Sequence, residues 1–248
     1  MGSEVETESA NTRVSPYAEN VLWLEDIQAA DPFPRYDAEV GRLRGHLGSL
    51  DAAGWEAPSH CQGWSVKDVL SHLAAGEVYN QACLDGTLGE LDFKGGIDGW
   101  NARAVADRRS RAPADVLQEW SERQADVRQR WGRLGSEAQI STAVGSYPLR
   151  LQLWHLGQEY ATHADDVRVP VPTSEVDPRL AWRCAFGLFA REEEGRPLNV
   201  QVTEQGVVLE GGKALEPEAF LAFLTERPQH LGDASQRRLV EDLLREDR

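Results

Sequence analysis

The segment EYATH places a carboxylate and an imidazole four residues apart, as Glu159 and His163. Residues four apart in a helix lie on one face, one turn from each other, so both side chains can bind the same ion. Glutamate and histidine are both common zinc ligands, and three protein ligands leave a fourth coordination position open for chemistry. The pair therefore predicts a divalent metal site that needs a third ligand from another part of the chain.

His72 is the histidine best placed to complete this site. It shares one face of a predicted helix with Val69 and Gly76, and that face should point into the core. Helical bundles assemble metal sites from side chains on facing helices. Periodicity alone leaves two alternatives open, because His155 lies four residues before Glu159 and could replace either ligand, and His72 could be a hydrogen-bonded core histidine.

The environment of the ligands is also predictable in part. Asp166 follows His163 by three residues and can orient its imidazole by accepting a hydrogen bond from the second ring nitrogen. Two imidazoles and a carboxylate suit zinc, but they also accept nickel, iron or manganese. We expect zinc, with Asp166 in the layer of side chains behind the ligands.

Four segments with helical spacing of apolar residues must position these side chains. Ser65 and Asp68 form a helix start signal, Pro113 begins a second long helix, and Pro170 and Pro172 end the last one. A bundle buries four such stripes economically, so we expect a four-helix bundle over residues 20–170. The four predicted helices span about residues 35–50, 65–84, 113–134 and 149–167.

The remainder of the chain predicts a small α+β C-terminal domain over residues 175–248. Residues 169–178 (VPVPTSEVDP) have the composition of a linker, and a helix is expected from Arg179 to about Glu193. LNVQVT and VVLEGG alternate as short strands, and two helical stretches follow them, PEAFLAFLTE and SQRRLVEDLLRE. The fold class is thus mainly α, with residues 1–19 as a flexible polar tail.

Composition excludes several classes of partner. A formal net charge of −15 argues against binding nucleic acid and against an anionic membrane surface. No apolar run approaches the roughly 20 residues of a membrane-spanning helix, and the first residues lack the apolar region of a secretory signal. Three cysteines without a CxxC pair suit a reducing compartment, so we expect a cytoplasmic protein, monomeric or homodimeric.

The string CQGWSVKDVLSHLAAGE resembles the signature of the mycothiol-dependent maleylpyruvate isomerase family, whose members are DinB-like metal-binding bundles. That signature has a Cys-x-Gly-Trp-Ser/Thr-Val loop, then an Asp and a His-Leu-Ala run, and a later E-x-x-x-H-x-x-D matches its second half. The resemblance covers about residues 20–168. It implies that His72, Glu159 and His163 are the metal ligands, and it leaves His155 a structural or pocket-lining role.

The resemblance extends weakly into the C-terminal part. Family members often have an apolar helix followed by Gly-Arg and then Gly-Asp, whereas FLAFLTERPQHLGD has Glu226-Arg227 and then Gly232-Asp233. It implies that Arg227 is a catalytic residue that holds a substrate carboxylate, a role that suits the two-point fork of a guanidinium. Arg150 is a second candidate for that role.

The resemblance implies a zinc-dependent thiol transferase or isomerase, in which a low-molecular-weight thiol such as mycothiol attacks a small electrophile. A metal with an open position serves this chemistry because it lowers the pKa of a bound thiol. Two alternatives remain open. One is a zinc hydrolase with Asp166 or Glu77 as base, and the other is a non-enzymatic module that binds a small molecule or a regulatory partner.

Overall fold

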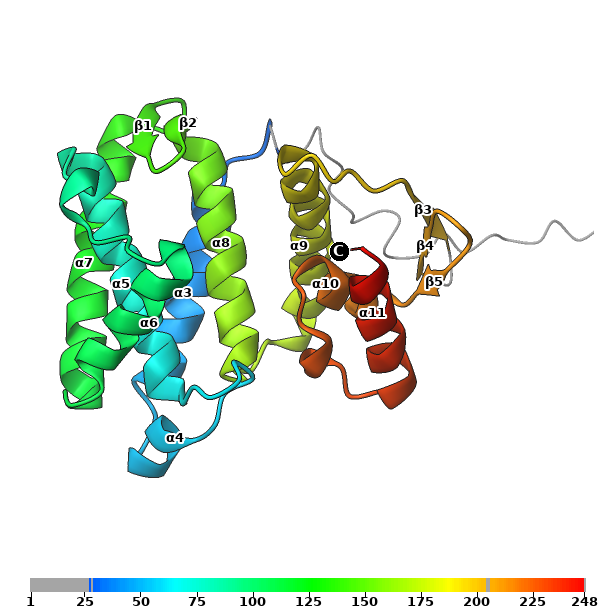
Figure 1. The fold of residues 1–248 in the computed structure, drawn as a ribbon, viewed down its shortest axis with the longest axis horizontal. Coiled ribbons are helices and arrows are strands. Elements are labelled where there is room, and N and C mark those ends of the chain that lie inside the picture. The colour runs from blue at the N-terminus through cyan, green and yellow to red at the C-terminus, as the bar shows by residue number, and fades with distance from the viewer. Residues whose placement is uncertain (1–26, 28, 204–205, 248) are drawn as a thin grey trace, which may run out of the picture. The chain divides into compact units, whose positions relative to one another are not determined.

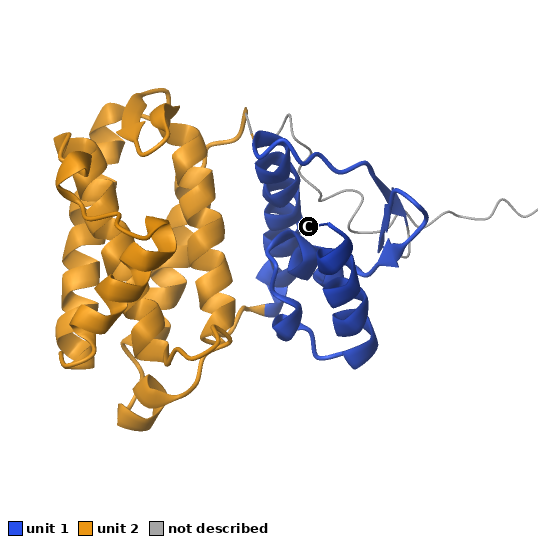
Figure 2. Cartoon of the chain, viewed as in Figure 1, with its two compact units in different colours: residues 1–23, 173–248 blue, residues 24–172 orange. Residues whose placement is uncertain are grey.

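The computed structural model describes residue 27 and residues 29–203 and 206–247, and the predicted tail at residues 1–19 lies outside this range. Within it, the chain divides into two compact units between Pro172 and Thr173 (Figure 2). Unit 2 precedes this division and unit 1 follows it. The boundaries 20–170 and 175–248, as limits of independently folding domains, stay predictions.

Unit 2 is built around four long helices, drawn from blue to yellow-green in Figure 1. They are α3 (Phe33–Leu47), α5 (Val66–Asp85), α7 (Pro113–Leu134) and α8 (Leu149–Asp166). Helix α5 packs against α7, and α3 packs against α8. The predicted four-helix bundle is confirmed in its helices, each within a few residues of the expected bounds.

The core of the bundle follows the apolar stripes of the sequence. Leu43 and Leu47 of α3 are buried, as are Trp120 and Trp131 of α7. The Tyr36 ring meets the edge of Trp131 with 6.0 Å between ring centroids. Fully burying side chains of this size contributes about 1.5–3 kcal/mol each, which holds the helices in the positions that the site requires.

The start of α5 is fixed by its own residues. The Ser65 hydroxyl accepts from the backbone N–H of Asp68, and the Asp68 carboxylate accepts from the backbone N–H of Ser65, both at 3.2 Å. This is the capping box that the sequence predicts. It sets the first turn of the helix that carries His72.

Short elements complete unit 2. Helices α4 (Ala52–Glu56) and α6 (Gly96–Arg108) lie in the connections, together with the short helix η1 (Leu88–Glu90). A hairpin of β1 (Gln139–Thr142) and β2 (Gly145–Pro148) joins α7 to α8, with antiparallel pairing. The sequence pattern left this hairpin unassigned because each strand has only four residues.

Unit 1 combines helices with a small antiparallel sheet of order β3-β4-β5. Its sheet is formed by short strands and its helices pack beside one another, α10 against both α9 and α11. The elements are α9 (Thr173–Glu193), β3 (Val200–Thr203), β4 (Gly206–Leu209), β5 (Ala214–Leu215), α10 (Pro217–Leu224), η2 (Pro228–His230) and α11 (Ala234–Glu246).

The predicted linker at residues 169–178 is wrong over its second half. Helix α9 begins at Thr173 and includes Pro178 as its sixth residue. Pro178 has no N–H to donate to the carbonyl oxygen of Ser174, so the helix forgoes one intrahelical hydrogen bond just after its first turn. The fold class, mainly α with small sheets, is confirmed. Among the described residues, no helix is both long and apolar enough to cross a membrane.

Candidate metal centre

Helices α5 and α8 bring His72, Glu159 and His163 together inside unit 2. The Glu159 Oε1 atom lies 2.8 Å from His72 Nε2 and 3.2 Å from His163 Nε2. The two imidazole rings stand edge to face, with 4.8 Å between their centroids. One donor atom from each residue lies within 4.8 Å of the other two, so the three side chains that the sequence singled out form one cluster.

The cluster has the dimensions of a metal site. Ligand atoms about 2.0–2.2 Å from a tetrahedral zinc ion stand about 3.4 Å apart. The observed separations of 2.8 and 3.2 Å are shorter by a few tenths of an ångström. Small side-chain movements would therefore convert these hydrogen bonds into coordination bonds, and the donor set of two imidazoles and one carboxylate fits zinc.

Asp166 fixes the orientation of His163. Its Oδ2 atom lies 3.0 Å from His163 Nδ1, and the carboxylate is fully buried. A carboxylate accepts hydrogen bonds, so Nδ1 carries a proton and Nε2 is the nitrogen that faces Glu159. His72 differs, because no described residue forms a hydrogen bond with its buried Nδ1 atom.

Charges in the cluster stabilise one another. Burial acts to lower the pKa of His163, but Glu159 and Asp166 raise it, and the net pKa lies well above its ordinary value. Burial acts to raise the pKa of Glu159, but His163 and His72 hold it well below its ordinary range. The raised pKa of His163 favours the form with a proton on both ring nitrogens, between the carboxylates of Glu159 and Asp166. A metal ion must displace the proton on Nε2, so metal binding weakens as pH falls.

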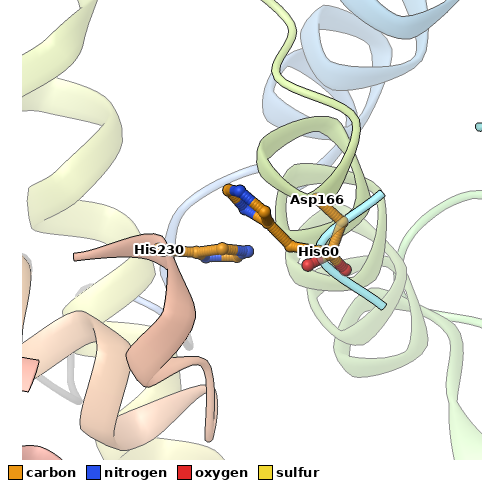
Figure 3. A group of neighbouring side chains, drawn as sticks. All are labelled: His60, Asp166 and His230. Atoms are coloured by element: carbon orange, nitrogen blue, oxygen red, sulfur yellow. The ribbon is translucent and has the colours of Figure 1, made fainter. Parts of the chain in front are cut away.

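The loop before α5 adds a third group to this arrangement. The Cys61 thiol donates to Asp166 Oδ2 at 3.1 Å, and its sulfur lies 3.9 Å from His163 Nδ1. The backbone N–H of His60 donates to the carbonyl oxygen of Asp166 at 2.9 Å. The side chains of both residues are labelled in Figure 3. Residue spacing alone does not predict the contact of Cys61 with Asp166. The position of Cys61 in the Cys-x-Gly-Trp motif was the one signal of this contact.

A pocket of about 270 Å³ opens beside His72 and Glu159. The Glu159 side chain is 45% exposed, which leaves its carboxylate accessible from the pocket. His155 also lines the pocket, and its Nε2 atom lies 3.2 Å from the Tyr147 hydroxyl of β2. His155 is not in the cluster of donor atoms around Glu159. Its place agrees with the pocket-lining role that the family resemblance implied.

A buried network lies behind the pocket wall. The hydroxyl groups of Tyr36 and Tyr160 both donate to Glu77 Oε1, and Asn80 Nδ2 donates to Glu77 Oε2 at 3.2 Å. Glu77 is fully buried. Burial raises its pKa to about 6, while these hydrogen bonds limit the rise. Glu77 and Asp166 are therefore both enclosed, and neither lines the pocket.

The two arginines with a proposed role in binding a carboxylate lie in different units. Arg150 is engaged within unit 2, where it donates to the Ala30 carbonyl at 2.6 Å and lies 3.7 Å from Glu137, and it does not line the pocket. Arg227 belongs to unit 1 and precedes η2. Its guanidinium group donates to the Thr225 carbonyl at 3.4 Å. The catalytic role of Arg227 stays a prediction.

Comparison with models of protein families identifies the family of the chain. A family model described as the mycothiol maleylpyruvate isomerase N-terminal domain matches residues 36–168, more than half of the chain. The chain belongs to this family. The match spans helices α5 and α8 and thus all three residues of the cluster.

Solved structures show the same fold. Crystal structures of mycothiol-dependent maleylpyruvate isomerase, and of a histidine-to-alanine mutant of it, each match with a TM-score of 0.54 and 14% identity. Each match covers 82% of this chain and 99% of the other. At this identity the likeness concerns the fold. A comparison with curated protein sequences finds no match.

Proposed function

We propose that the protein is a zinc-dependent thiol transferase or isomerase that activates a low-molecular-weight thiol such as mycothiol for attack on a small electrophile. The observation that carries this proposal is the cluster of His72, Glu159 and His163 at the wall of a pocket. The family of the chain and the mycothiol-dependent isomerase that shares its fold support the choice of a thiol.

The ligands would be the Nε2 atoms of His72 and His163 and a carboxylate oxygen of Glu159. A divalent metal held by three ligands would supply an open position at which a thiol loses its proton near neutral pH. Asp166 would keep His163 in the tautomer that leaves Nε2 free. The pocket would hold the electrophile within reach of the sulfur.

The reaction balances without any further reactant. In the addition step, the sulfur forms a C–S bond to one alkene carbon and the π electron pair moves to the neighbouring carbon. That carbon then takes up one proton, which balances the proton that the thiol lost. Rotation about the resulting single bond, followed by loss of the same proton and of the thiolate, regenerates the alkene with changed geometry. Retention of the C–S bond gives transfer of the thiol instead.

Metal analysis of variants tests the ligand assignment. Protein purified without chelator should contain close to one zinc per chain, and His163→Ala should lose it, because the variant removes one of three ligands. His155→Ala is the matched control, since His155 lines the same pocket but lies outside the donor cluster, and it should keep its zinc. Full zinc occupancy in His163→Ala would show that the assignment is wrong.

Thiol dependence separates the proposed reaction from the alternatives. A thiol transferase is inactive until a thiol is added, whereas a zinc hydrolase turns over in water alone. The two residues considered as hydrolytic bases, Asp166 and Glu77, are fully buried, which disfavours that alternative. A zinc-loaded protein that neither binds nor consumes low-molecular-weight thiols would return the chain to the class of binding or regulatory modules.

A further inference from the structure

The loop of residues 59–64, which precedes α5, is held by two sets of hydrogen bonds. One set reaches α8, because the backbone N–H of His60 and the Cys61 thiol both donate to Asp166, at 2.9 and 3.1 Å. The other set closes the loop on itself, because the backbone N–H and the hydroxyl of Ser59 both donate to the Trp64 carbonyl, at 3.0 and 2.8 Å. The backbone of Trp64 is therefore fixed by its neighbours in the loop.

A tight turn inside this loop determines where Trp64 lies. The backbone N–H of Trp64 donates to the Cys61 carbonyl at 3.0 Å, and Gly63, the third residue of the turn, has a φ of +79°. A type II turn has a positive φ at its third residue, which favours glycine. A Cβ atom at Gly63 would meet no atom within 4 Å, so glycine is favoured there by the backbone conformation and not by packing. Trp64 leaves this turn directly before Ser65, the capping residue of α5.

The Trp64 ring contacts one of the proposed metal ligands. Its centroid lies 5.5 Å from that of the His72 imidazole, and the two ring planes are tilted by 46°. Aromatic rings attract one another at centroid separations of about 4.5–7 Å. The indole also packs against the apolar core of unit 2, which limits its own rotation. The His72 ring therefore has a fixed neighbour that restricts rotation about its side-chain bonds.

The two histidine ligands are supported by different means. Asp166 Oδ2 lies 3.0 Å from His163 Nδ1, and this hydrogen bond orients the His163 ring. His72 packs instead against Trp64, and its centroid lies 4.8 Å from that of the His163 ring. A ligand binds its metal well only when its ring is held in the orientation that coordination requires. One loop contributes to both supports, since Cys61 contacts Asp166 and Trp64 contacts His72.

We propose that Trp64 is a positioning residue of the metal centre, whose indole ring holds the plane of the His72 imidazole so that Nε2 points toward Glu159 and the metal. The proposal rests on the ligand assignment of the proposed function and is independent of the thiol chemistry. It gives each named residue of the Cys-x-Gly-Trp motif a physical role. Cys61 supports the other histidine through its carboxylate partner, Gly63 forms the turn, and Trp64 orients the ligand.

The zinc affinities of two variants test this role. In the full-length protein, competition with a chromophoric chelator should give Trp64→Leu a zinc dissociation constant at least about tenfold above that of wild type, because the flat ring against His72 is lost. Trp64→Phe keeps an aromatic ring and should bind zinc within a few-fold of wild type. Wild-type affinity in Trp64→Leu, or an equal loss in Trp64→Phe, would overturn the proposal.

Trp55→Leu is the matched control for the loss of a tryptophan. Trp55 lies in α4, is buried, and belongs to the same apolar core against which the half-buried Trp64 packs. The rings that contact His72 are those of Trp64 and His163. Trp55→Leu should therefore lose at least as much stability against denaturant as Trp64→Leu and keep the zinc affinity of wild type. An equal loss of zinc affinity in the two variants would overturn the proposal, because general loosening of the core would then explain both.

Cobalt in place of zinc reports the geometry of the site as well as its affinity. The visible absorption of a cobalt ion depends on the number and arrangement of its ligands. At saturating cobalt, Trp64→Leu should differ from wild type in band position and intensity, whereas Trp64→Phe and Trp55→Leu should match wild type. A Trp64→Leu spectrum identical to that of wild type would overturn the positioning role even if the affinity is lower.

Failure of this proposal is distinguishable from failure of the proposed function, because no thiol or substrate enters either metal titration. Zinc binding that depends on Trp64, in a protein that consumes no thiol, would refute the thiol chemistry and support the role of Trp64. Thiol consumption by wild type, together with unchanged zinc affinity and an unchanged cobalt spectrum in Trp64→Leu, would overturn the role of Trp64 and leave the proposed function standing.

Discussion

Asp166→Asn isolates the contribution of a residue that touches the metal ligand His163 without being a ligand itself. The substitution keeps the size of the side chain and removes its charge. In the folded protein the Asp166 carboxylate is fully buried and lies 3.0 Å from His163 Nδ1. An amide is a weaker acceptor, and its NH2 group stabilises the tautomer in which Nδ1 lacks a proton. That tautomer carries its proton on Nε2, where the metal should bind.

The expected size of the effect follows from this contact. A hydrogen bond to a charged group contributes about 1.5–3 kcal/mol. Loss of a hydrogen-bond partner behind a metal ligand weakens metal binding about 10–100-fold, or about 1.4–2.8 kcal/mol. The two estimates agree, so we expect the zinc dissociation constant of Asp166→Asn to rise by one to two orders of magnitude.

Competition with a chromophoric chelator at neutral pH measures this change. Asp165→Asn is the matched control, because it removes the same charge from the neighbouring residue of α8, outside the donor cluster. Circular dichroism of both variants without metal establishes that they are folded. Wild-type zinc affinity in Asp166→Asn, or an equal loss in Asp165→Asn, would refute the assigned role of Asp166.

Two further variants address the buried carboxylate and the arginine of unit 1. The pKa of Glu77 is raised to about 6 from its ordinary 4.5, so the folded state takes up a proton more readily, and Glu77 adds stability as pH falls from about 6 toward 4.5. Denaturant unfolding should therefore show Glu77→Gln gaining about 1.2 kcal/mol relative to wild type on going from pH 5 to pH 7; a difference that is independent of pH would contradict the raised pKa. Arg227→Ala should raise the KM for maleate and leave both the KM for maleamide and the zinc content unchanged, and unchanged kinetics with maleate would end the predicted role of Arg227 in binding a carboxylate.

Local sequence patterns predicted most of the bundle because its helices carry their own signals. The Ser65–Asp68 capping box starts α5, and Pro113 starts α7. The predicted start of α9 was wrong because the local signal there, a proline, indicated a later start than the one observed. Pro178 was treated as a helix boundary, yet α9 begins five residues earlier, and a rule about proline cannot weigh the packing that favours the longer helix.

The residues of the candidate site were likewise predictable only where a local pattern connects them. Glu159 and His163 were predictable as a pair because they lie one turn apart on the same helix. The approach of His72 to Glu159 depends on the arrangement of α5 and α8 in the bundle, since the two residues are 87 positions apart in the sequence. Only the family resemblance selected His72 over His155. The contact of Cys61 with Asp166 has no periodic signature, because it arises where a loop meets a helix face that is distant in sequence.

All three proposed ligands, Asp166 behind them and every residue lining the adjacent pocket belong to unit 2. The family model likewise ends at residue 168, before unit 1 begins. A separately expressed fragment that contains unit 2 would therefore carry every group that the proposed metal centre needs, so zinc binding by such a fragment would not depend on unit 1.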